Sequence, residues 1–252
     1  MGLGLNAATD PEFKNYRLSS VQNTEINPIH MELIPSNVND ETLSHFKTEF
    51  GIWIITSGLR EVIERFAIFL DSMHHACQMM ACNKHKLEPA EAQRLDKSFR
   101  FKGMEDKLSE LERRFGIKPK HPDYIVSINQ ARNCLAHRLG RVGIEDCKQG
   151  EALEVKWIGM DFQIELESGK ILSANEAVGV VIPEAGAAQL KIVERSKSFP
   201  LGTFARFGMH ELAEICNFML GSIQEVTASA IQYANSIGIP FQEKGSDNKS
   251  TA

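Results

Sequence analysis

The sequence predicts a mainly α-helical fold, in which four main helices form a bundle and a small antiparallel β insertion separates the third helix from the fourth. Apolar residues recur at three- and four-residue steps over residues 39–149 and again over 204–241, as in helices with one buried face. Over residues 150–203, apolar and polar residues alternate, which is typical of strands. We expect residues 1–38 to form a loosely ordered arm and residues 242–252 a disordered tail.

The first two helical regions are bounded by recognisable end signals. The first is predicted to begin at Asn39 or Asp40, because both side chains can cap a helix N-terminus. An apolar stripe that includes Phe46, Phe50, Trp53, Phe66 and Met80 follows, and we expect it to form core or a dimer seam. The second region is predicted over 89–115, opened by Pro89 and ended by Gly116.

The β insertion is predicted to contain several short strands. Residues 153–157 and 160–166 are interpreted as two strands with Gly159 between them, and a turn then leads into Ile171 and Leu172. Residues 177–182 and 189–193 supply further candidates. The insertion has no Ser, His or Asp constellation, so we expect a packing, dimer or substrate-guiding element.

The third helix is predicted over about 122–138, and a charged residue interrupts its apolar face. Pro122 suits its first turn, and Gly140 follows its end. Its apolar arc consists of Tyr124, Ile125, Ile128, Ala131, Leu135 and Leu139. Arg132 falls inside this arc, and an unpaired buried charge is costly. We therefore expect a carboxylate, such as Glu110 or Glu112, a symmetric partner or an anionic ligand beside it. The fourth helix is predicted from Phe207 to near Gly238.

The third helix also carries residue types that suit phosphate chemistry. Arg132 presents a permanently charged planar fork to phosphate oxygens, and His137 can both take and give a proton near neutral pH. Together they favour RNA cleavage without a metal. A plainer interpretation has Arg132 paired with a glutamate of a neighbouring helix and His137 stabilised by the helix C-terminus. On an ideal helix the two side chains are about 140° apart, so their convergence requires an early helix end or a partner subunit.

The segment from Arg132-Asn133 through Leu135-Ala136 to His137 resembles the Arg-x(4–6)-His motif of the HEPN superfamily. This resemblance implies a helical bundle that dimerises so that two motifs face one composite site, usually for metal-independent RNA cleavage. It implies that Arg132 and His137 are catalytic and that Asn133 is a supporting polar residue. Some toxins of the family carry a tyrosine, modified by the antitoxin, where Leu139 stands here. The leucine at this position argues against a toxin whose antitoxin is a nucleotidyltransferase.

From this resemblance we expect a metal-independent endoribonuclease of toxin or defence type that acts as a homodimer on RNA. Arg138 and Arg141 are the candidate substrate-binding residues, within a stretch that is more basic than the whole chain. An antitoxin or regulatory protein is a further expected partner. We expect no cofactor and no metal. Two alternatives stay open: a non-catalytic HEPN-like module that binds a nucleotide, RNA or protein, and a structural regulatory dimer.

The composition of the chain argues against some classes of protein and predicts a cellular compartment. A net charge of −5 argues against a nonspecific nucleic-acid coat. No apolar run approaches the ~20 residues of a membrane span. Five widely spaced cysteines and no signal peptide predict a cytoplasmic protein. Residue types that can bind zinc cluster at His74, His75, Cys77, Cys82 and His85. The cluster lacks a paired Cys-x2-Cys or Cys-x2-His motif, so we interpret its members as buried cysteines and helix-end histidines.

Overall fold

A computed structural model of the chain describes residues 19–22, 29–32, 39–84, 87–147, 150–173, 176, 181–182 and 184–239. The chain divides into two compact units. One comprises residues 1–59 and 206–212, and the other comprises residues 60–205 and 213–252. The candidate site residues all belong to the second unit.

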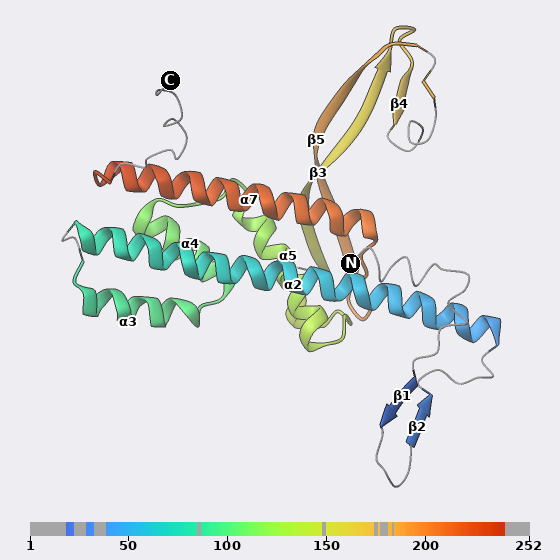
Figure 1. Cartoon of the computed structure of the whole chain (residues 1–252), viewed down its shortest axis with the longest axis horizontal. Helices are drawn as coiled ribbons and strands as arrows, with labels where there is room; N and C mark the ends of the chain where they lie inside the picture. The colour runs from blue at the N-terminus through green and yellow to red at the C-terminus, as the bar shows by residue number, and fades with distance from the viewer. Residues whose placement is uncertain are drawn as a thin grey trace, which may run out of the picture. The chain divides into compact units, whose positions relative to one another are not determined.

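Five α-helices dominate the described residues (Figure 1). Their bounds are Asp40–Asn83 for α2, Pro89–Arg100 for α3, Met104–Phe115 for α4, Pro122–His137 for α5 and Met209–Ser236 for α7. The mainly helical prediction is therefore confirmed. None of the described helices contains a segment that is apolar enough to cross a membrane. The prediction of a disordered tail falls on residues outside those described.

Several helix ends follow the local signals in the sequence. Asn39 Oδ1 accepts a hydrogen bond from the Thr42 backbone N–H at 2.8 Å, which is the capping bond expected at the start of α2. Gly116 ends α4 with φ 68°, a left-handed conformation that a residue without Cβ adopts without strain. Pro122 occupies the first turn of α5. These boundaries arise from local backbone chemistry and need no tertiary contact.

The prediction of one helical region over residues 89–115 is wrong, because this stretch forms two helices. Helix α3 ends at Arg100, and α4 begins at Met104. Gly103 has extended backbone angles, φ −66° and ψ 166°, at the N-terminal cap of α4. The turn of Phe101, Lys102 and Gly103 lets both helices bury apolar side chains, including Phe99 and Met104. The described residues thus contain five helices where four were predicted.

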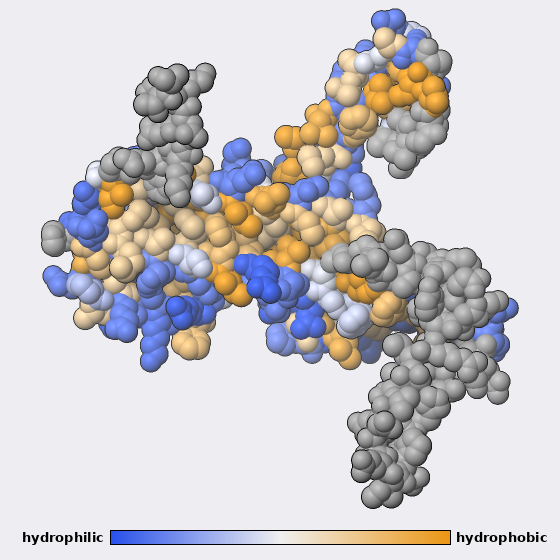
Figure 2. Space-filling view, in the orientation of Figure 1, coloured by the Kyte–Doolittle hydropathy of each residue, from blue (hydrophilic) through white to orange (hydrophobic). Residues whose placement is uncertain are grey.

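The β insertion is a three-stranded antiparallel sheet in the order β4-β3-β5. Strand β3 spans Ala152–Leu166, β4 spans Ile171–Ser173 and β5 spans Gly186–Pro200. Strands β3 and β5 run side by side as a long hairpin, with β4 near its far end (Figure 1). Exposed apolar side chains lie on the outer part of this hairpin, among them Phe162, Leu190 and Ile192 (Figure 2).

Gly159 does not separate two strands as predicted, because β3 continues through it opposite Val193. A Cβ at this position would lie 2.5 Å from Glu214 Oε1 and 2.9 Å from Arg195 Cγ. Glu214 also accepts a hydrogen bond from Trp157 Nε1 at 2.9 Å. The glycine is therefore required by a close tertiary approach between the hairpin and α7.

The remaining strand predictions have mixed outcomes. Residues 189–193 belong to β5, as part of a longer strand. Most of 177–182 lies outside the described residues, and Val181 and Ile182 are not in a strand. Within the N-terminal arm, β1 (Ser19–Gln22) and β2 (Ile29–Glu32) pair in antiparallel register.

The predicted apolar stripe of α2 has a buried part and an exposed part. In the second unit, Phe66 and Leu70 are buried and belong to the core. In the first unit, Phe46, Phe50 and Trp53 are exposed, and the last two rings stack with centroids 5.9 Å apart. Other core side chains of the second unit come mainly from helices: Ile63, Leu111, Ile125, Ile128, Cys134, Ile215, Val226 and Ala234.

Candidate functional site

Helix α5 presents the motif from within the second unit. Its buried face includes Ile125, Ile128, Ala131 and Leu135. Ser127 connects the helix to the hairpin, because the Lys156 backbone N–H donates a hydrogen bond to Ser127 Oγ at 2.9 Å. The helix ends at His137, one residue before the predicted end, and Leu139 and Gly140 then take positive φ values of 51° and 83°. The scaffold around Arg132 is thus packed on several sides.

Arg132 has a carboxylate partner, as its position in the apolar arc predicts. Its Nη2 donates to Glu64 Oε1 of α2 at 2.8 Å, and its Nη1 donates to Asn133 Oδ1 at 3.1 Å. The expectation of Glu110 or Glu112 is wrong, because Glu110 pairs with Lys102 and Glu112 with Lys118. The Arg132 side chain is 26% exposed, while its Nε is buried without a hydrogen-bond partner. A planar fork of this kind can still reach an anion.

Arg132 and Asn133 line a pocket of about 220 Å³ between α2, α5 and the turn that joins α3 to α4. Its charged lining residues are Arg132, Lys102, Lys107 and Glu64. Three cations and one carboxylate line the pocket, and Lys102 and Lys107 are also paired with Glu110 and Asp71 just outside the lining. The pocket thus gathers guanidinium and ammonium donors, which are the groups that bind phosphate oxygens in proteins.

His137 lies apart from this pocket. It is the exposed last residue of α5, and it is not among the pocket-lining residues. Because the helix continues through Ala136, no early helix end turns His137 toward Arg132. One chain therefore brings together Arg132 and Asn133 but leaves His137 on another part of the surface.

The two predicted substrate-binding arginines differ in their surroundings. Arg138 forms ion pairs with Asp146 and with Glu145, the latter at 3.2 Å. The hydrogen bond to Asp146 is the main cause that raises the pKa of Arg138. Arg141 is exposed and forms an isolated antiparallel bridge with Phe204. Neither residue lines the Arg132 pocket, and only Arg141 presents an exposed side chain.

Lys102 and Lys107 are site residues that the sequence interpretation missed. The Lys107 side chain is only 5% exposed. Its Nζ binds Asp71 at 2.6 Å and lies 5.5 Å from the Phe99 ring centroid. A signal was present, because Lys107 falls among the apolar residues Met104, Leu108 and Leu111 at helical spacing.

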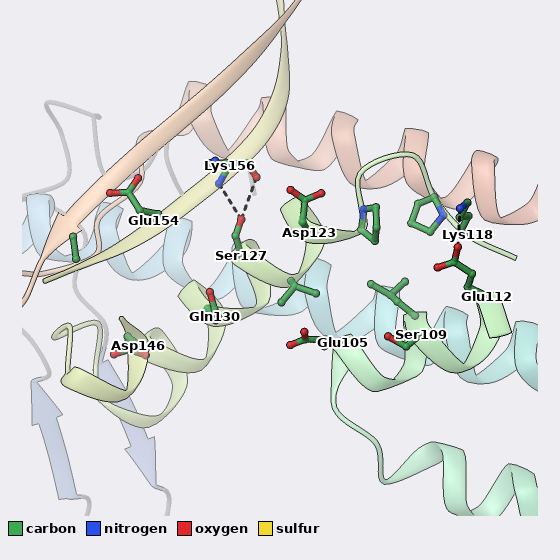
Figure 3. A pocket seen from close by; sticks show the side chains of 15 residues that line it. Glu105, Ser109, Glu112, Lys118, Asp123, Ser127, Gln130, Asp146, Glu154 and Lys156 are labelled. Carbon is green, nitrogen blue, oxygen red and sulfur yellow. Dashed lines mark hydrogen bonds and ion pairs between the residues drawn. The ribbon is translucent and has the colours of Figure 1, made fainter. Parts of the chain in front are cut away.

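A larger pocket of about 840 Å³ lies between α4, α5 and the base of the hairpin (Figure 3). Its lining includes the carboxylates of Glu105, Glu112, Asp123, Asp146 and Glu154. Only two cations, Lys118 and Lys156, line the same pocket, and Lys118 is bound to Glu112. The acidic lining repels an RNA backbone, so the smaller pocket is the better candidate for phosphate.

The His74 and His75 side chains contact a carboxylate, and the cysteines form no disulfide. His74 Nδ1 and His75 Nδ1 lie 2.7 Å and 2.5 Å from the two carboxylate oxygens of Asp96. His85 is outside the described residues. Within the described ranges, no group of three or more His, Cys, Asp or Glu side chains is arranged to hold a metal. All five cysteines are free thiols.

Comparison of the chain with protein-family models, curated proteins and solved structures finds no match.

Proposed function

We propose that the protein is a metal-independent endoribonuclease of toxin or defence type that acts as a two-fold homodimer. The observation that carries this proposal is the position of Arg132. Its guanidinium is held between Glu64 and Asn133 and lines a pocket together with Lys102 and Lys107. A permanent cation in such a position can stabilise negative charge on the nonbridging oxygens of a phosphodiester.

In this mechanism the ribose 2′-hydroxyl attacks the adjacent phosphorus while His137 takes its proton. The new O2′–P bond forms as the P–O5′ bond breaks, and Arg132 stabilises the charge that develops on the phosphate. The products are a 2′,3′-cyclic phosphate and a 5′-hydroxyl. The departing 5′-oxygen needs a proton, which the His137 of a second copy supplies. Asn133 supports the site by accepting a hydrogen bond from Arg132.

A homodimer also answers the geometric problem within one chain. His137 is exposed and does not line the Arg132 pocket, so the composite site draws its two histidines from both copies. Two-fold symmetry supplies a second helix α5 with the same motif. The exposure of His137 leaves its ring accessible to that second copy.

The test compares the wild-type protein with Arg132→Ala and His137→Ala on mixed RNA in EDTA. We expect both substitutions to abolish cleavage. The matched controls are Arg94→Ala and His45→Ala, which remove the same residue types from exposed positions outside the pocket. Circular dichroism checks that each variant folds. Cleavage that persists in folded Arg132→Ala or His137→Ala contradicts the proposal.

The second candidate function is a non-catalytic module that binds RNA or a nucleotide through its phosphate. The separation of His137 from the Arg132 pocket favours this alternative. It predicts that Arg132→Ala abolishes RNA binding, while His137→Ala binds as the wild-type protein does. The nuclease predicts that His137→Ala binds RNA and fails to cleave it, so binding and cleavage measured together separate the two functions.

A further inference from the structure

We propose that the pocket beside Arg132 is a subsite for a second phosphate of the RNA, adjacent to the scissile phosphate, and that Lys102 binds it. This inference rests on the proposed function, because that proposal makes RNA the ligand. It adds a specific residue from outside the motif helix and a specific part of the substrate.

The pocket is formed by three segments that are distant in the sequence. Helix α2 contributes Glu64, helix α5 contributes Asn129, Arg132 and Asn133, and the turn between α3 and α4 contributes Lys102. The break between α3 and α4 is what places Lys102 here, since it lies between the two helices. One guanidinium, two ammonium groups and two amides, counting Lys107 of α4, therefore line a single cavity of about 220 Å³.

Each cation that lines this pocket is paired with one carboxylate, Arg132 with Glu64 at 2.8 Å. Lys102 Nζ binds Glu110 Oε2 at 2.9 Å, and Lys107 Nζ binds Asp71 Oδ1 at 2.6 Å. Neither of these carboxylates lines the pocket, where Glu64 is the acidic lining residue. Burial pushes the pKa of Glu110 upward, but the hydrogen bond from Lys102 and nearby positive charges outweigh this, so its pKa is lowered. A phosphate inside the pocket therefore shares each cation with one carboxylate: Glu64, Glu110 or Asp71.

Lys102 is better placed than Lys107 to contact a ligand. The Lys107 side chain is almost fully buried and is fixed by Asp71 and the Phe99 ring. Lys102 is 35% exposed, and an ammonium has three N–H donors, so its bond to Glu110 leaves donors for a phosphate oxygen. Lys107 contributes a fixed positive charge, which solvent screens less because it is buried.

The amide of Asn133 also favours a phosphate. Asn133 Oδ1 accepts the hydrogen bond from Arg132, so its amide NH₂ group is oriented away from that bond. Phosphate has several acceptor oxygens and suits a site with mixed amide, guanidinium and ammonium donors. Because Arg132 and Lys102 line the same cavity, one strand can place neighbouring phosphates on the two cations.

The experiment measures binding without cleavage. The probe is a uridine trinucleotide with 2′-O-methyl riboses, which cannot be cleaved by 2′-hydroxyl attack. It is compared with the same trinucleotide carrying one neutral methylphosphonate linkage, placed at either position. The proteins are wild type, Lys102→Gln, Lys102→Arg and the control Lys97→Gln, which alters an exposed lysine of α3 that does not line the pocket.

We expect the wild type, Lys102→Arg and Lys97→Gln to prefer the probe with two charged phosphates by about tenfold. Lys102→Gln should bind both probes nearly equally, and its slope of log affinity against log salt should fall by about 0.7. Equal preference in Lys102→Gln and wild type overturns the subsite, as does a wild type that binds neither probe or prefers neither. A wild type without this preference overturns the subsite even if Lys102→Gln fails to fold.

Failure of the subsite is distinguishable from failure of the proposed function. If the trinucleotide preference depends on Lys102 but RNA is never cleaved, the subsite stands and the nuclease falls. If RNA is cleaved but Lys102→Gln keeps the preference, the nuclease stands and the subsite falls.

Discussion

Arg132 Nη2 donates to Glu64 Oε1 at 2.8 Å, so the cation of the motif is bound by a carboxylate from another helix. A carboxylate on a guanidinium occupies the position that a phosphate oxygen takes when the same guanidinium binds nucleic acid. Both side chains are partly exposed, 26% for Arg132 and 40% for Glu64. A partly exposed pair of this kind contributes little to stability, about 1 kcal/mol or less, and can be displaced.

The substitution Glu64→Gln should therefore raise RNA affinity by about three- to tenfold. It removes the competing negative charge and keeps the shape of the side chain. The measurement is RNA binding at low and moderate salt, with Glu61→Gln as the matched control on the same helix, where Glu61 pairs with Arg65. Weaker binding by Glu64→Gln would show that Glu64 instead orients Arg132 for its ligand.

Cleavage should depend on dimer formation. At protein concentrations below the dimer dissociation constant, the rate per protomer should rise in proportion to concentration, because the dimer concentration then follows the square of the protomer concentration. Initial rates over a dilution series, together with sedimentation measurements at the same concentrations, test this. A constant rate per protomer across the monomer range would rule out the composite site.

Stability should decrease below about pH 6.5 because of His74. Burial lowers the pKa of His74, outweighing the hydrogen bond and charge of Asp96, which raise it. Between the lowered pKa and 6.5 the unfolded chain binds a proton that the folded chain does not, so the free energy of unfolding falls as pH falls. Below the lowered pKa this contribution is constant.

The pH dependence is measured by urea unfolding between pH 7.5 and pH 5, as an experimental range about the ordinary histidine value. The groups facing His74 are Asp96, Glu110, Gln78 and Arg114. The substitution His74→Gln should flatten the slope, and His75→Gln, which alters the exposed neighbour, should keep it. An unchanged slope in His74→Gln would assign the effect to other groups.

Gly159→Ala should destabilise the hairpin strongly, by about 1–3 kcal/mol. The new Cβ would lie 2.5 Å from Glu214 Oε1, which accepts a hydrogen bond from Arg195, while Glu214 Oε2 accepts one from Trp157. The control is Gly51→Ala, because nothing lies within 4 Å of a Cβ at that helical position. Alanine there should be neutral or stabilising by up to about 1 kcal/mol. Equal thermal midpoints for the two variants would contradict the close approach at Gly159.

Sequence patterns predicted the features of the fold that depend on neighbouring residues. Asn39, Pro122 and Gly116 act through their own backbone and side-chain chemistry, so the start of α2, the start of α5 and the end of α4 agree with the structure. The continuous β3 strand was missed because Gly159 is required by Glu214, 55 positions later, and not by a local turn. The break at Gly103 was missed because a charged pattern continues on both sides of it.

The same distinction applies to the candidate site. The position of Arg132 among apolar residues predicted a carboxylate partner, since buried charge requires compensation. Its identity as Glu64, 68 positions earlier, depends on how α2 packs against α5 and has no local signal. Lys102 and Lys107 join the pocket for the same reason. The roles of Arg132, Asn133, His137, Arg138 and Arg141 in RNA cleavage stay predictions.

The most direct measurement of the central claim is the chemistry of the RNA ends after incubation with wild-type protein in EDTA. Attack by the 2′-hydroxyl leaves 2′,3′-cyclic phosphate and 5′-hydroxyl ends, and we expect these ends with wild type and none with His137→Ala. Fragments with 3′-hydroxyl and 5′-phosphate ends, or cleavage that requires a divalent metal, would contradict a metal-independent site built from Arg132 and His137.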